Sequence, residues 1–276
     1  METSELILLD GAMGTMLQSA GLPAGLPPEV WNITKPDKVT AVHKQYIAAG
    51  SRVIYTNTFG VNRFKTERCG YSVKELVTAA IACAVKAAEG SGVKIALDIG
   101  PLGKLLEPLG TLKIEEAAEA FREIVTAGKE AGADLVIIET MSDLAEAKAA
   151  LLAVKECSNL PVWVTMTFES NGRTFLGTTI PSMALTLEGL GADAIGFNCS
   201  LGPEVLLPMI DELREWTSLP LILKPNAGLP DPATGTYPLN AETFARLTAE
   251  APKHGIQMLG GCCGTSPAFI QEIKKS

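Results

Sequence analysis

The sequence predicts an α/β protein built as one (β/α)8 barrel, and three observations lead to this fold. Short apolar runs alternate with longer segments of helical periodicity along the whole chain. Eight such units fit into the 276 residues without a Pro- or Ser-rich linker between them, so residues 1–276 are treated as one domain. The apolar runs are continuous, which is typical of parallel strands covered on both faces. An open, doubly wound sheet is the alternative.

The first half of the chain supplies four of these units. Its strands are expected where short aliphatic runs end at a polar or turn residue: residues 6–9, 53–55, 93–97 and 135–138. Its helices are expected where apolar residues recur three or four positions apart: residues 37–49, 74–90, 114–131 and 143–156. The first of these helices carries Val39, Val42 and Tyr46 on one side, and Gly50 ends it.

The second half repeats the alternation with four more units. Its strands are expected at residues 161–167, 193–198, 219–224 and 256–260. Its helices are expected at residues 181–190, 203–216, 241–251 and 267–275, three of which have a proline at or near the first helical position. The last helix closes the eighth unit and completes the ring.

Polar side chains gather where the expected strands end: Asp10, Asn57, Asp98, Glu139, Asn198, Cys199, Asn226, Cys262 and Cys263. In a barrel, all of these positions lie at the one face where catalytic groups are found. Polar residues also begin ordinary loops, and Asp98 and Asn226 are interpreted as residues that tie turns together. Asp10 and Glu139 are carboxylates placed directly after aliphatic runs, which favours an ammonium-binding role beside a metal site.

Three of the six cysteines lie at two of these strand ends, Cys199 in one turn and the Cys262–Cys263 pair in another. Thiolates are soft ligands that suit zinc, and three of them leave one of its four positions open, as in a catalytic site. Burial as ordinary small apolar residues is the alternative. A disulfide is disfavoured, because residues 1–5 are acidic and do not begin a secretory leader.

The other three cysteines, Cys69, Cys83 and Cys157, have no cysteine near them and are interpreted as packing residues. The net charge of −8 disfavours nucleic acid as a partner. No apolar run approaches the roughly 20 residues of a membrane span. A cytoplasmic location is expected. With only two histidines in the chain, thiols and carboxylates are the main candidates for the chemistry.

The chain resembles the homocysteine S-methyltransferase family over nearly its full length. The resemblance is carried by six motifs: Asp10-Gly11-Ala12-Met13-Gly14-Thr15, Thr56-Asn57-Thr58-Phe59-Gly60, Ile138-Glu139-Thr140, Gly196-Phe197-Asn198-Cys199, Lys224-Pro225-Asn226-Ala227-Gly228 and Gly260-Gly261-Cys262-Cys263-Gly264. Within the family, the first motif and residues 28–65 look most like the N-terminal homocysteine-binding module of the cobalamin-dependent methionine synthases. The chain is then either a free-standing protein or one module of such an enzyme.

The resemblance implies a (β/α)8 barrel enzyme that transfers a methyl group to the thiol of homocysteine and so forms methionine. It implies one zinc ion per chain, bound by Cys199, Cys262 and Cys263. It further implies that Asp10 and Glu139 bind the amino end of homocysteine and that backbone groups around Gly11, Thr56 and Asn57 hold its carboxylate. Asn198, beside Cys199, is counted with the substrate-binding residues.

The methyl donor is expected to be a methyl-corrinoid such as methylcobalamin, carried by a separate protein or by the other domains of a methionine synthase. A small donor of the S-methylmethionine or betaine type is the alternative within the family. Two alternatives lie outside it: a lyase that forms a Schiff base through Lys224, and a non-catalytic subunit that binds zinc or an amino acid.

Overall fold

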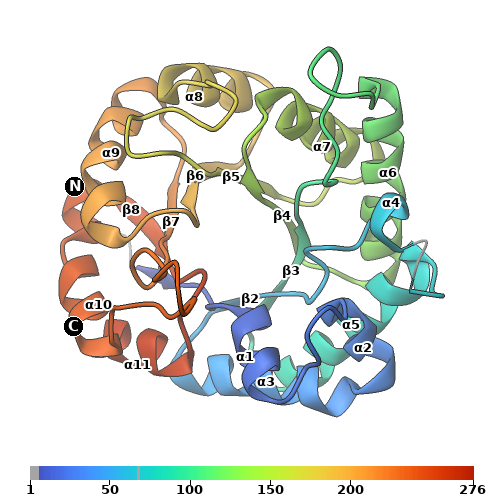
Figure 1. The fold of residues 1–276 in the computed structure, drawn as a ribbon, viewed down its shortest axis with the longest axis horizontal. Coiled ribbons are helices and arrows are strands. Elements are labelled where there is room, and N and C mark those ends of the chain that lie inside the picture. The colour runs from blue at the N-terminus through green and yellow to red at the C-terminus, as the bar shows by residue number, and fades with distance from the viewer. Residues whose placement is uncertain (1–5, 67–68) are drawn as a thin grey trace.

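The structure is a computed structural model in which residues 6–66 and 69–276 are described. Eight parallel strands form one sheet in the order β1-β8-β7-β6-β5-β4-β3-β2, and Figure 1 shows them as a ring seen end-on. The strands are β1 (Ile7–Leu8), β2 (Val53–Tyr55), β3 (Lys94–Ile99), β4 (Leu135–Met141), β5 (Val162–Met166), β6 (Ala194–Asn198), β7 (Leu221–Lys224) and β8 (Ile256–Leu259). The predicted (β/α)8 barrel is confirmed.

Helices surround the ring on its outside (Figure 1). The helices that follow the strands are α3 (Pro36–Ala49), α5 (Val73–Ala88), α6 (Ile114–Ala131), α7 (Leu144–Cys157), α8 (Ile180–Gly189), α9 (Pro203–Trp216), α10 (Ala241–Thr248) and α11 (Pro267–Lys275). Each matches a predicted helix to within a few residues. Shorter elements that were not predicted occupy the connections: α1 (Met13–Ser19), η1 (Pro28–Val30), α2 (Trp31–Thr34), α4 (Arg63–Thr66) and η2 (Ala251–His254).

The ring is completed between β1 and β2, where a side chain supplements the backbone. The N–H of Arg52 donates to the carbonyl of Leu8 at 2.7 Å. Three residues beyond Arg52, the N–H of Tyr55 donates to Oδ2 of Asp10, also at 2.7 Å. The carboxylate of Asp10 thus takes the place of a backbone carbonyl as the acceptor for Tyr55. It joins β1 to β2 at the carboxyl ends of the two strands.

Two strands continue further than the sequence predicted. Asp98 lies inside β3 and Glu139 inside β4, rather than in the turns that follow. The prediction ended each strand at its first polar residue. The barrel interior accepts polar side chains at the carboxyl ends of the strands (the upper end), however, so β3 and β4 continue through Asp98 and Glu139. The two strands pair in parallel register, with Asp98 opposite Ile137 and Ile99 opposite Ile138, so Asp98 and Glu139 lie on the same face of the sheet, with Glu139 two residues further along.

The core has two parts, one inside the ring and one between the ring and the helices. Inward-facing side chains fill the lower barrel, among them Leu9, Val53, Ile137, Ile222 and Met258. A larger cluster packs the outward faces of the strands against the helices. This arrangement leaves only the upper end of the ring free for polar groups.

Within residues 6–66 and 69–276, no helix combines the length and the apolar character needed to cross a bilayer. The expectation about the acidic first five residues concerns a segment outside the described residues.

The packing makes a prediction for β6. A Cβ atom on Gly196 would overlap the carbonyl oxygen of Ile222 in β7, and backbone cannot move away as a side chain can. We therefore expect Gly196→Ala to lower the free energy of unfolding by about 1–3 kcal/mol, the usual cost of overpacking. Urea unfolding of the purified protein measures this change.

The matched control is Gly189→Ala at the exposed end of α8, where a Cβ would meet nothing within 4 Å. That substitution should leave stability unchanged or raise it by up to about 1 kcal/mol, because alanine favours the helix. Equal unfolding midpoints for the Gly196→Ala protein and the unmodified protein would contradict the proposed close contact between β6 and β7.

Candidate active site

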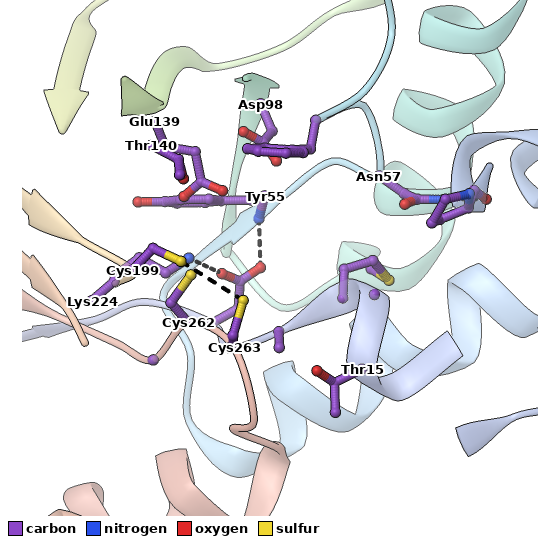
Figure 2. A pocket seen from close by; sticks show the side chains of 18 of the residues that line it. Thr15, Tyr55, Asn57, Asp98, Glu139, Thr140, Cys199, Lys224, Cys262 and Cys263 are labelled. Carbon is purple, nitrogen blue, oxygen red and sulfur yellow. Dashed lines mark hydrogen bonds and ion pairs between the residues drawn. The ribbon is translucent and has the colours of Figure 1, made fainter. Parts of the chain in front are cut away.

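A pocket of about 290 Å³ opens at the carboxyl ends of the strands. Residues at or just after the ends of seven of the eight strands reach it, and they include carboxyl, ammonium and thiol groups. The pocket is lined by four carboxyl groups (Asp10, Glu29, Asp98 and Glu139), one ammonium (Lys224) and three thiols (Cys199, Cys262 and Cys263). The pocket is thus the one place where the chemistry-bearing residues predicted from the sequence come together, as Figure 2 shows.

The three predicted thiols converge, although about sixty positions separate Cys199 from the Cys262–Cys263 pair in the chain. The Sγ atoms of Cys199, Cys262 and Cys263 all lie within 4.8 Å of one another. Those of Cys199 and Cys263 are 3.8 Å apart. Within the described residues, this is the single group of three or more metal-ligating side chains. Cys69, Cys83 and Cys157 take no part in it and pack in or against the core, as predicted.

The backbone conformation of the turn after β6 directs the Cys199 thiol toward the other two. Cys199 adopts a left-handed conformation with φ of 62° directly after β6, and Ser200 follows it with φ of 56°. Such angles cost a non-glycine residue of the order of 1 kcal/mol, so neighbouring contacts must hold the turn in place. The N–H of Cys199 donates to the carbonyl of Lys224 at 3.1 Å and supplies one such contact.

The Cys262–Cys263 turn is fixed in the same way by the strand beside it. The N–H of Cys262 donates to the carbonyl of Pro225 at 2.8 Å. The N–H of Cys263 donates to Oδ1 of Asn226 at 3.1 Å. Asn226 therefore ties turns together, as the sequence indicated, and the turns it ties are those that carry the thiols.

The thiol cluster has the dimensions of a metal site. In tetrahedral coordination, a zinc–sulfur distance of about 2.3 Å separates two sulfur ligands by about 3.8 Å, and the Cys199 and Cys263 sulfurs are 3.8 Å apart. Hydrogen bonds from the Cys199 and Cys262 thiols lower the pKa of Cys263 to about 3. Three sulfur ligands form a soft donor set, which suits a thiophilic cation.

Asp10 and Lys224 form a buried ion pair at the floor of the pocket. Nζ of Lys224 lies 2.8 Å from Oδ1 of Asp10, and both side chains are less than 5% exposed. The same ammonium lies 3.4 Å from the ring centroid of Tyr55, in a cation–π arrangement. Burial opposes the charge of Lys224, but Asp10 and Tyr55 outweigh it and raise the pKa of Lys224 well above its ordinary value. A lysine held this way has no free lone pair for a Schiff base.

Glu139 and Asp98 lie on the opposite side of Tyr55 from the thiols in Figure 2. Burial raises the pKa of Glu139 to about 7. Burial and the nearby Glu139 raise the pKa of Asp98 well above its usual range. Within the described residues, Oδ1 of Asp98 and the hydroxyl of Tyr55 are buried without any hydrogen-bond partner.

Asn198 is fully buried and does not line the pocket. Its Oδ1 accepts from the N–H of Thr140 at 2.8 Å and from the hydroxyl of Thr165 at 2.7 Å. Its Nδ2 donates to Oγ1 of Thr140 at 2.7 Å and approaches Sγ of Cys262 at 3.9 Å. Asn198 therefore joins the ends of β4, β5 and β6 from behind the pocket wall.

Gly11, Thr56 and Asn57 line the pocket beside α1. A Cβ on Gly11 would lie 2.6 Å from Oγ1 of Thr265, so only glycine fits there. The side chain of Asn57 turns away and donates to the carbonyl of Pro28 and to Oδ1 of Asn32, both at 2.9 Å. Among the described residues, the N–H groups of Gly11 and Asn57 donate to no protein acceptor, whereas the N–H of Thr56 is bonded to Ala96.

The sequence analysis missed Tyr55 and Thr140, interpreted Asp98 as a residue that ties a turn, and considered Lys224 only as the Schiff-base lysine of an alternative lyase. Tyr55 and Lys224 end apolar strands and look like core residues in a linear pattern. Side chains alternate between the two faces along a strand, so this alternation could have predicted that Tyr55 and Lys224 point into the barrel.

Comparison with known proteins identifies the family of this chain. The sequence model of the homocysteine S-methyltransferase family matches residues 7–276. The chain is 33% identical over 285 residues to a methionine synthase of Mycobacterium tuberculosis (strain ATCC 25618 / H37Rv) and 32% identical to that of Mycobacterium leprae (strain TN). These alignments cover 96% of this chain, which spans 24% of the length of either relative.

Among solved structures, the metallated form of the homocysteine methyltransferase MmuM from Escherichia coli superposes with a TM-score of 0.86 at 24% identity, covering 98% of this chain and 96% of that one. This likeness supports the barrel fold. Because the family match extends over almost all of the sequence, the chain belongs to the homocysteine S-methyltransferase family.

Proposed function

We propose that this barrel binds one zinc ion through Cys199, Cys262 and Cys263 and transfers a methyl group to the sulfur of homocysteine, which yields methionine. The observation that carries the proposal is the convergence of three thiols, within 4.8 Å of one another, on the wall of a pocket that also holds carboxyl groups. Three protein ligands leave room for one exchangeable ligand, which is the arrangement of a catalytic zinc site.

When bound, zinc would supply the Lewis acidity that keeps a thiol ionised at neutral pH, where a free thiol with a pKa of about 8.5 is mostly protonated. The chain's own residues orient the acceptor. Glu139 takes the ammonium group of homocysteine, and Asp10 adds negative charge to the same pocket. The unbonded N–H groups of Gly11 and Asn57 take the carboxylate. Asn198 acts from behind the wall by holding Thr140 and the strand ends in place.

A methyl-corrinoid carried on a separate protein or domain is the donor we propose. The support is the 33% identity to a methionine synthase that is about four times as long as this chain, since the alignment covers 24% of it. A small donor such as S-methylmethionine is the second candidate, because the pocket of about 290 Å³ is large enough for a small molecule. We further propose a cytoplasmic setting, where the three thiols would stay reduced.

The test is a donor panel with the zinc-loaded protein and L-homocysteine. Methylcobalamin, S-methylmethionine and betaine are supplied separately, and methionine is quantified. Methionine from methylcobalamin alone supports the corrinoid donor, and methionine from a sulfonium or betaine alone supports the small donor. Tight homocysteine binding without methionine from any donor would instead support a non-catalytic subunit.

The cysteine cluster makes the first prediction. Cys199→Ser or Cys262→Ser should reduce the bound zinc from one per chain to less than about one tenth, because a hydroxyl is a poor ligand for a soft site. Methionine formation should fall by at least about a hundredfold. Metal analysis by mass spectrometry and the donor assay measure the two effects. Cys157→Ser, outside the cluster, is the control and should retain zinc and activity; a zinc-free Cys262→Ser protein with normal turnover would contradict the mechanism.

The raised pKa of Glu139 makes the second prediction. L-norleucine carries the amino and carboxylate groups but no thiol, so its binding reports on the amino-acid end alone. Only the ionised form of Glu139 attracts the ammonium, and its pKa in the free protein is about 7. Affinity should therefore rise with pH between about 5.5 and 7, by up to about tenfold per unit, and level off above 7. Calorimetric titration across this range gives the profile.

The control for this profile is Glu139→Gln, which has no charge to gain. It should bind L-norleucine weakly and with little pH dependence over the same range. A profile that is equally steep in the Glu139→Gln protein would assign the titration to another group.

A further inference from the structure

We propose that Asp98 belongs to the ammonium subsite and, with Glu139, makes the pocket select α-amino acid thiols over thiols that lack the amine. This inference rests on the proposed function, since it specifies how the amino end of the acceptor is recognised. The sequence alone favoured a turn-tying role for Asp98.

The first observation is an unsatisfied carboxyl oxygen in the pocket wall. Asp98 is 6% exposed and lines the pocket, yet its buried Oδ1 has no hydrogen-bond partner within the described residues. Leaving a buried acceptor unpaired costs about 1–3 kcal/mol, more for a charged group. A ligand that brings hydrogen-bond donors to this point removes the cost.

The direction of this side chain is fixed by its backbone. The N–H of Asp98 donates to Oγ1 of Thr56 at 3.0 Å, and its carbonyl accepts from Oγ1 of Thr58 at 2.6 Å. These two bonds tie both sides of the residue to the neighbouring chain after β2. The carboxyl group therefore points into the barrel mouth, on the same side of the pocket as Glu139 in Figure 2.

The second observation is that Asp10 is already engaged. Its Oδ1 accepts from Lys224 at 2.8 Å, and its Oδ2 accepts from the N–H of Tyr55 at 2.7 Å. An ammonium placed against Asp10 would also approach the ammonium of Lys224, which is buried and therefore poorly screened. Two other carboxyl groups of the pocket, Glu139 and Asp98, form no direct ion pair with a cation among the described residues.

The chemistry of the two carboxyl groups fits an ammonium ligand. Asp98 and Glu139 come from paired strands at nearly the same level, because Asp98 is opposite Ile137 and Glu139 is two residues beyond it. Two neighbouring buried carboxyl groups repel when both are ionised. One ammonium, with three N–H donors and one positive charge, relieves this repulsion and provides donors for both.

The test compares two ligands in two variants of the zinc-loaded protein. The ligands are L-homocysteine and 4-mercaptobutanoic acid, which has the thiol and the carboxylate but no amine. In Asp98→Asn the affinity for L-homocysteine should fall about tenfold to a hundredfold, the usual effect of losing a charge-assisted hydrogen bond. The affinity for 4-mercaptobutanoic acid should stay within about twofold. Calorimetry measures both dissociation constants.

Glu29→Gln is the matched control, because Glu29 is another buried carboxylate that lines the same pocket. Its Oε1 accepts from the N–H of Gly60 at 2.7 Å, a bond that glutamine preserves. The ratio of the two dissociation constants should be unchanged in this variant. A changed ratio here, equal to that of Asp98→Asn, would overturn the assignment, because the effect would then follow from the overall charge.

The remaining outcomes separate this inference from the proposed function. If 4-mercaptobutanoic acid binds the unmodified protein but Asp98→Asn weakens neither ligand, or both equally, Asp98 is not in the ammonium subsite. If L-norleucine, which has the amine but no thiol, binds as tightly as L-homocysteine and both lose affinity in Asp98→Asn, the amine subsite stands and the zinc–thiol part of the proposed function fails.

Discussion

The closure of a parallel barrel is the constraint on which the rest of this structure depends. Since every strand runs in the same direction, every carboxyl end lies on one rim, and residues from distant parts of the chain meet there. The sulfurs of Cys199 and Cys263, in the turns after β6 and β8, lie 3.8 Å apart for this reason. The seam between β1 and β2 relies partly on the Asp10 carboxylate, so a residue of the pocket also takes part in closing the ring.

This double use of Asp10 determines the electrostatics of the pocket. Once Asp10 accepts from both Lys224 and Tyr55, its charge is largely balanced inside the protein. Glu139 and Asp98 have no such cationic partner among the described residues, and burial raises the pKa of each carboxyl group. The Lys224 ammonium and the three thiols then occupy one part of the pocket, and the carboxyl groups of Glu139 and Asp98 occupy the other. Such a division suits a substrate with a thiol at one end and an ammonium at the other.

Much of the fold was accessible from the sequence because its signals are local. Continuous apolar runs predicted all eight strands, and helical spacing predicted the eight helices that follow them. The errors fall at strand ends, where Asp98 and Glu139 lie inside β3 and β4. A polar residue ends a strand in a linear pattern, but a barrel interior with an open upper end accepts one. The short helices of the connections were missed because segments of three to seven residues are too short to show a helical repeat.

The sequence by itself determined the order of the strands and helices, the residues that reach the rim and the thiols suited to a soft metal. These follow from apolar periodicity and from the chemistry of each side chain. Only the tertiary structure decided which of these groups face one another. The pairing of Lys224 with Asp10, the position of Asn198 behind the wall and the unpaired Oδ1 of Asp98 all depend on distances between strands far apart in the chain. A linear pattern contains no such distances, because strand pairing and the direction of each side chain are settled only when the ring closes.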